Sequence, residues 1–116
     1  MEIEVNDYVR TEFGNIGKFY RPASESSDVY YIYINKDGNK ISSRYDSIVK
    51  HSNNIIDLIE IGDILRVFDN LSETEEKVNI FDDEMLKAVK EDIKDNNYKI
   101  LSILTHEQFS SLEYII

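Results

Sequence analysis

The sequence predicts an α+β fold: a small, strongly bent antiparallel sheet or SH3-like barrel, with one main amphipathic helix over residues 82–94. Short runs rich in tyrosine, isoleucine and valine alternate with asparagine, aspartate and glycine, a pattern typical of strands joined by turns. One later segment has helical periodicity instead. The chain has 116 residues, 41% of them hydrophobic, and only one proline, which favours a single domain over residues 1–116.

The first predicted hairpin comes from the N-terminal strand-like runs. Residues 3–11 and 16–20 flank a turn at Gly14-Asn15. A polar loop is expected over residues 21–28, because it contains the one proline, which cannot donate to a strand ladder.

The second predicted hairpin has the clearest strand of the chain, over residues 29–34. The Asp37-Gly38 pair that follows is a strong hairpin signal. The return strand begins at residues 40–43, and a less regular extended segment is expected around residues 48–49.

The middle of the chain predicts shorter elements. One short helical turn is expected over residues 55–58, after a run of serine and asparagine that can cap it. Residues 64–68 form a strand. The acidic residues 72–77 are expected to be a loop or a strand edge, ahead of strand-like residues 78–81.

The predicted helix over residues 82–94 has a clear beginning and one apolar face. Asp82 or Asp83 supplies the N-cap, and acids near the start and lysines near the end match the helix dipole. Apolar residues recur at four-residue spacing, at Met85, Val89 and Ile93.

A strand and a short helical turn are predicted after this helix. Residues 98–104 read as a strong strand. Residues 105–108 have the spacing of a capping box, so a helical turn is expected there, with Phe109 packing inward.

Two segments of the chain have similar sequences, a similarity that we call the sequence echo. Glu4–Arg10 resembles Glu60–Arg66, with glutamate, an aliphatic residue, aspartate, an aliphatic or aromatic residue and arginine in matching places. The echo has two interpretations: a duplicated half-barrel, or convergence of two strands that are both entered through a tight turn.

Four blocks of the sequence resemble a largely uncharacterised group of small phage and prophage proteins of low-GC Gram-positive bacteria. These blocks are residues 6–11, 14–18, 48–63 and 103–109. Members of the group usually have glycine where this chain has Asn6. The resemblance implies a phage-encoded accessory protein that acts in the cytoplasm of an infected cell. It transfers no catalytic or binding residue, and it leaves residues 21–47 and 70–97 outside the match.

The charge of the chain excludes several classes of partner. The formal net charge is −10, which disfavours direct binding to nucleic acid or to an anionic membrane surface. No apolar run approaches the roughly 20 residues of a membrane-spanning helix, and the N-terminus lacks the profile of a signal peptide. A location in the host cytoplasm is therefore expected.

Catalytic and metal-binding motifs are absent from the sequence. There is no cysteine, and neither histidine, His51 or His106, has a metal-ligand partner two to four residues further along. Both are interpreted as surface or turn histidines, so no enzyme, no metal and no cofactor is predicted. A weak enzyme that uses one of them as a general base is the alternative.

Tyrosines cluster on one predicted strand. Tyr30, Tyr31 and Tyr33 fall on both of its faces. We interpret them first as core residues, second as a protein-binding face, since tyrosine is common at interface hot spots, and third as base-stacking groups.

The acidic run over residues 72–84 is the most informative feature. It holds six acids and one base; the acids are Glu73, Glu75, Glu76, Asp82, Asp83 and Glu84. Such a run is commonly a solvated face. The sharper interpretation is an ordered array of carboxylates that occupies the basic nucleic-acid channel of another protein.

The sequence therefore predicts a non-enzymatic phage accessory protein that binds and inhibits a host protein with a basic surface. A nucleic-acid-handling defence system is the expected target, as for an anti-CRISPR protein. The six acids and the three tyrosines are the candidate partner-binding residues. The alternative is a phage structural or morphogenesis module that self-associates through strand edges.

Overall fold

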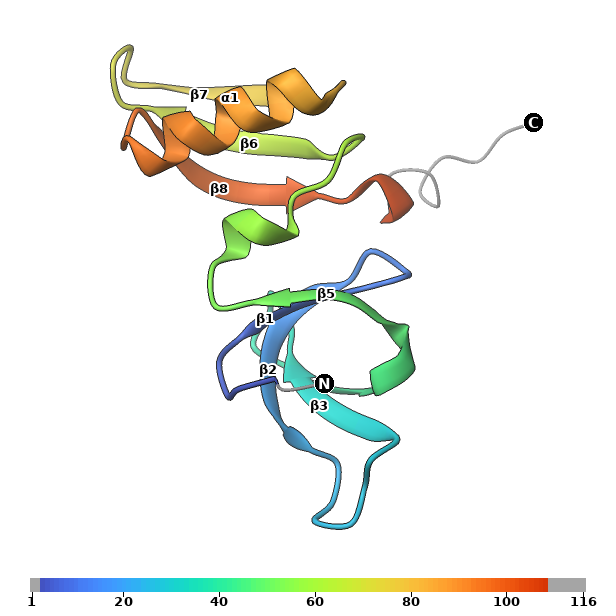
Figure 1. The fold of residues 1–116 in the computed structure, drawn as a ribbon. Helices are drawn as coiled ribbons and strands as arrows, with labels where there is room; N and C mark the ends of the chain where they lie inside the picture. The colour runs from blue at the N-terminus through green and yellow to red at the C-terminus, as the bar shows by residue number, and fades with distance from the viewer. Residues whose placement is uncertain (1–2, 109–116) are drawn as a thin grey trace, which may run out of the picture. The chain divides into compact units, whose positions relative to one another are not determined.

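The computed structural model describes residues 3–108, which form two antiparallel sheets and one main helix (Figure 1). The α+β class predicted from the sequence is confirmed. The sequence predicts one domain over residues 1–116. The contacts group the chain into two compact units, Met1–Leu58 and Ile59–Ile116, and we describe each unit by itself.

The first unit is a five-stranded antiparallel sheet. Its strands are β1 (Tyr8–Thr11), β2 (Ile16–Pro22), β3 (Tyr30–Ile34), β4 (Lys40–Arg44) and β5 (Ile48–Ser52). They lie in the order β4-β3-β2-β1-β5, so both predicted hairpins are confirmed. Two 3-10 turns complete the unit, η1 (Tyr45–Ser47) and η2 (Ile55–Leu58), the second where a helical turn is predicted.

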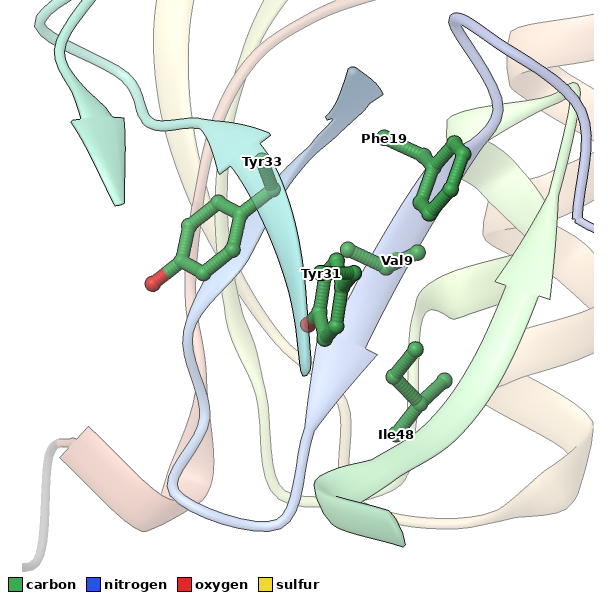
Figure 2. Close-up of a cluster of buried hydrophobic side chains, with 5 residues drawn as sticks. All are labelled: Val9, Phe19, Tyr31, Tyr33 and Ile48. Carbon is green, nitrogen blue, oxygen red and sulfur yellow. The ribbon is translucent and has the colours of Figure 1, made fainter. Parts of the chain in front are cut away.

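The core of the first unit is largely aromatic. It consists of Val9, Phe19, Tyr31, Tyr33 and Ile48, whose side chains are drawn in Figure 2. The rings of Phe19 and Tyr31 stack with their centroids 5.8 Å apart, and Tyr33 lies the same distance from Tyr31. Aromatic pairs at such distances stabilise a core beyond the area that they bury.

A glycine on β2 makes room for this core. A Cβ atom added to Gly17 would lie 2.3 Å from Cδ2 of Tyr33 and 2.6 Å from the carbonyl oxygen of Ile34. No side chain fits at that distance. Gly17 therefore allows the ring of Tyr33 to pack directly onto the backbone of the neighbouring strand.

The second unit is a three-stranded antiparallel sheet with a helix across it (Figure 1). Its elements are β6 (Ile64–Asp69), β7 (Thr74–Asn79), α1 (Asp83–Lys94) and β8 (Tyr98–Leu104), with the strands in the order β7-β6-β8. Oδ1 of Asp82 accepts a hydrogen bond of 2.8 Å from the backbone N–H of Met85, which confirms the predicted N-cap. A helical turn begins at His106, as the capping-box spacing predicts, whereas Phe109 lies outside the described residues.

The strand β7 corrects one expectation from the sequence. The sequence favours a loop or strand edge over residues 72–77 and a strand over residues 78–81, but the strand spans Thr74–Asn79. It is an edge strand with one buried residue, Val78, so its sequence lacks the apolar alternation that identifies strands. Charged side chains at such an edge also discourage pairing with other chains.

The two units share the same three-strand arrangement. In each, the strand after a Glu-x-x-Asp turn lies between the next strand and the last strand of the unit, so β2-β1-β5 corresponds to β7-β6-β8. Pairing with the last strand shifts register directly after Arg10 in one unit and directly after Arg66 in the other. The register shift thus falls at the same position relative to the shared turn in both units, and both interpretations of the sequence echo, duplication and convergence, remain.

Candidate functional site

The second unit contains most of the negative charge. It has fourteen acids and six bases, whereas the first unit has nine acids and seven bases. The six candidate acids lie along β7, in the turn before it and at the start of α1; all six are exposed. We call this set the acidic edge: Glu73, Glu75, Glu76, Asp82, Asp83 and Glu84.

The acidic edge does not form one flat face. Glu75 lies opposite Phe68 on β6, and Glu76 lies opposite Val67, so the two carboxylates point to opposite faces of the sheet. Val67 is fully buried, which assigns Glu76 to the core side of the sheet. The carboxylates therefore lie on both sides of the β7 edge.

The three remaining acids lie at the N-terminus of α1. Asp82 caps the helix, and Asp83 and Glu84 occupy its first turn, where carboxylates interact favourably with the helix dipole. Phe81 directly precedes them and is 73% exposed, and Leu71 in the turn before β7 is 81% exposed. One exposed apolar side chain thus precedes the acidic edge in the sequence, and another lies between its β7 acids and its helix acids.

The structure separates the three candidate tyrosines. Tyr31 is fully buried and Tyr33 is 5% exposed, so both belong to the core of the first unit, whereas Tyr30 is 45% exposed. Their predicted role in partner binding is corrected for Tyr31 and Tyr33, because a buried ring presents no surface to a partner. Only Tyr30 of the three offers a surface, and the guanidinium of Arg44 lies 5.7 Å from its ring centroid.

Burial also changes the acidity of the core tyrosines. It raises the pKa of Tyr31 to about 12 and raises the pKa of Tyr33. Both hydroxyls are therefore neutral at physiological pH and serve packing. At the surface of the same unit, a hydrogen bond from Arg44 lowers the pKa of Asp46.

The two histidines lie in different units. His51 is an exposed residue of β5 in the first unit. Nε2 of His106, in the second unit, lies 3.2 Å from Oε1 of Glu60 and 2.7 Å from Oε1 of Glu107. Sequence reasoning missed this cluster, because it searched for partners two to four residues away and Glu60 lies 46 residues before His106.

Comparisons with protein-family models, with curated proteins and with solved structures found no match to this chain. Within the described residues 3–108, no helix is long and apolar enough to cross a membrane.

Proposed function

We propose that the chain is a non-enzymatic accessory protein, of phage origin, that binds and inhibits a host protein through the acidic edge. The target is a nucleic-acid-handling defence protein with a basic channel, as for an anti-CRISPR protein, and the site of action is the host cytoplasm. The observation behind the proposal is the ordered set of six exposed acids along one sheet edge and the adjoining helix start.

The spacing of an extended strand supports mimicry of nucleic acid. An antiparallel strand rises about 3.4 Å per residue, which equals the axial distance between phosphates along one strand of B-DNA, about 3.4 Å. Side chains on β7 alternate between two faces, so Glu75 and Glu76 follow one another at this rise on the two sides of the edge. Glu75 and Glu76 are the two carboxylates within β7, and Glu73 before the strand and the acids at the start of α1 extend this pair, so a basic channel would meet several carboxylates close together.

The exposed apolar residues favour a protein partner over small counter-ions. Leu71 precedes the acidic edge in the sequence, Phe81 directly precedes its helix acids, and both are among the most exposed large apolar side chains. An aromatic anchor beside charged groups is the usual composition of a protein-binding hot spot. Charge would accelerate the encounter and make it salt-sensitive, and Phe81 would slow dissociation.

The finer description of the first unit is also part of the proposal. Its five short antiparallel strands, with bulges in β2 and at the end of β1, resemble the strand order of an SH3-like barrel. In our account this unit is a structural support, and the activity of the chain lies in the second unit.

Self-association is the second candidate function. The tyrosine-rich strand β3 is paired on both sides, with β2 and β4, so its backbone is not available to another chain. Among the described residues the sheet edges are β4 and β5 in one unit and β7 and β8 in the other. Concentration-dependent mass in light scattering would favour this alternative.

The proposal is tested by immobilising the chain, passing host lysate over it and eluting bound proteins with short duplex DNA at constant salt. We expect DNA to release a nucleic-acid-binding protein, because both ligands would occupy the same basic surface. Proteins that salt releases but DNA does not would contradict mimicry. Recovery of no protein, from a chain that forms a defined oligomer, would support the structural alternative.

A further inference from the structure

A histidine and two glutamates converge in the second unit. Nε2 of His106 lies 3.2 Å from Oε1 of Glu60 and 2.7 Å from Oε1 of Glu107. One ligand atom from each residue lies within 4.8 Å of the other two. All three side chains are partly buried, with 42%, 25% and 20% exposure for His106, Glu60 and Glu107.

A buried aspartate positions two of these residues. Asp63 is fully buried, and its two carboxylate oxygens accept different backbone N–H groups: Oδ2 from Glu60 at 2.8 Å and Oδ1 from His106 at 3.0 Å. A single carboxylate thus joins the segment before β6 to the segment after β8. The backbone at two of the three residues is therefore held in place before any ligand binds.

Close packing positions the histidine ring itself. Gly62 has a φ of 98°, and a Cβ atom on it would lie 3.1 Å from Cβ of His106 and 3.4 Å from its Cγ. The ring therefore lies against the backbone of the turn that contains Glu60. Such contact limits the rotamers that His106 can adopt and keeps Nε2 directed toward the glutamates.

We propose that Glu60, His106 and Glu107 form a binding site for a divalent transition-metal ion, with zinc as its representative. The ligands would be Nε2 of His106 and one carboxylate oxygen of each glutamate, and water would complete the coordination. Two carboxylates balance the charge of the ion, and imidazole selects zinc-like ions over calcium and magnesium, which prefer oxygen ligands.

The distances suit this ion. Zinc bonds to nitrogen and oxygen ligands are about 2.0–2.2 Å long, so two ligand atoms at tetrahedral angles lie roughly 3.3–3.6 Å apart. Nε2 of His106 and Oε1 of Glu60, at 3.2 Å, are already within about 0.4 Å of this range. Oε1 of Glu107, at 2.7 Å, needs to withdraw by about 0.6–0.9 Å, which its flexible side chain allows.

Metal binding would link the segment before β6 to the segment after β8. Glu60 and His106 are 46 residues apart, and the ion would join the beginning of β6 to the end of β8. A ligand that binds only the folded state stabilises it by mass action. The site is independent of the acidic edge, so its success or failure leaves the proposed function untouched.

The test is isothermal titration of zinc into the full, untagged chain at neutral pH, with the metal alone as the probe. We expect one equivalent to bind, with a rise in the thermal midpoint. His106→Ala should abolish binding, and Glu60→Gln should weaken it by about tenfold or more, since even indirect contacts to a ligand change affinity 10–100-fold. His51→Ala is the matched control, because it removes the other histidine of the chain and should leave binding unchanged.

Histidine NMR signals give a second readout that does not depend on stability. We expect zinc to shift the side-chain nitrogen signals of His106 and not those of His51. Circular dichroism of each variant checks that it is folded. No binding of zinc by the folded chain, or binding that His106→Ala leaves intact, would overturn the proposal and identify the cluster as ion pairs only.

Discussion

The two units begin with the same turn and use it differently. In the first, the N–H of Glu4 donates to the Asp7 carboxylate at 3.1 Å, and the N–H of Asp7 donates to the Glu4 carbonyl at 3.0 Å. In the second, Glu60 and Asp63 form the same pair of bonds at 2.8 and 3.2 Å. The turn therefore directly precedes a strand in both units, although the elements that follow that strand differ.

The third residue of each turn explains why two different residue types serve there. Asn6 has a φ of 72° and Gly62 has a φ of 98°. This left-handed region favours glycine and tolerates asparagine better than most other residues. Each of these residues also donates its backbone N–H to a carbonyl, Asn6 to that of Phe19 in β2 and Gly62 to that of Ile80 directly after β7.

The two units differ in the elements that follow this shared turn and its strand. A β3–β4 hairpin completes the first unit around an aromatic core, whereas α1 covers the sheet of the second. The matching arginines also differ: Arg10 is fully buried and donates from Nη1 to the carbonyl of Leu58 at 2.9 Å, whereas Arg66 is exposed. The same three-strand arrangement thus has a structural arginine in one unit and a surface arginine in the other.

The largest expected difference between the units comes from these arginines. Arg10→Ala should reduce the free energy of unfolding of the first unit by about 3–4 kcal/mol, because it leaves a cavity and an unpaired carbonyl. Arg66→Ala, at the matching exposed position, should change the free energy of unfolding of the second unit by about 0.5 kcal/mol or less. Urea unfolding measures both, with tyrosine fluorescence for the first unit, which has six of the eight tyrosines, and the helical signal of α1 for the second. Equal losses of stability in the two variants would contradict the conclusion that Arg10 is a structural residue and Arg66 a surface residue.

The next largest difference in stability is expected between variants of the aspartates in the two turns. Asp63→Ala removes a buried carboxylate that two N–H groups need, so we expect a loss of about 2–3 kcal/mol in the second unit. Asp7→Ala, which removes a partly exposed carboxylate, should cost the first unit about 0.5–1 kcal/mol. The same urea experiment compares them. A larger loss at Asp7 would show that burial does not govern the strength of this turn.

Alkaline pH should destabilise the first unit more than the second. The pKa of Tyr31 is about 12 in the folded chain, against 10.0 for an ordinary tyrosine. The unfolded chain therefore releases the proton first, and the stabilising effect is complete below pH 10 and is lost as the pH rises toward 12. The loss should reach about 2 kcal/mol at pH 12 and about 3 kcal/mol at most above it, since one pKa unit corresponds to about 1.4 kcal/mol.

Tyrosine absorbance and fluorescence across this pH range measure the alkaline transition. Tyr31→Phe is the control variant, and it should flatten the dependence of the first unit on pH. If the second unit, followed by the signal of α1, loses stability in the same range and to the same degree, burial of Tyr31 is not the cause.

The smallest expected effect concerns the helix that only the second unit has. Asp82→Ala should reduce its stability by about 1 kcal/mol through loss of the N-cap, whereas Asp82→Asn should preserve the cap. Thermal unfolding at 222 nm distinguishes the two variants. If Asp82→Asn were as destabilising as Asp82→Ala, charge rather than capping would explain the role of Asp82.

Sequence reasoning predicted the elements whose signals are local. The helix is expected over residues 82–94 and found over Asp83–Lys94, and the last strand has the expected bounds, Tyr98–Leu104. A strand edge is one of the two expectations for residues 72–77, but the bounds of β7 differ from those expected, because its single buried residue leaves no alternating pattern.

The candidate sites depended on contacts that local patterns do not contain. Tyr30, Tyr31 and Tyr33 alternate along one strand, and only the sheet order decides which of them are buried. The cluster around His106 depends on Glu60, which a long connection brings to it. The similarity of the two turns places Glu60 in the turn before β6, but it gives no indication of the contact with His106.

The most direct test of the proposed function compares two variants of equal net charge. In the first, the acidic edge is neutralised by Glu→Gln and Asp→Asn at its six positions, which preserves the helix cap at Asp82. In the second, six exposed acids elsewhere are neutralised in the same way: Glu4, Glu12, Glu25, Asp28, Asp37 and Glu91. The measurement is the affinity of each variant for the host protein that duplex DNA releases.

We predict that neutralising the acidic edge weakens binding by at least about tenfold, and that the control variant binds within about twofold of the original chain. Equal losses would mean that total charge, and not the arrangement on β7 and α1, determines binding. Unchanged affinity of the first variant would contradict the claim that the acidic edge is the partner surface.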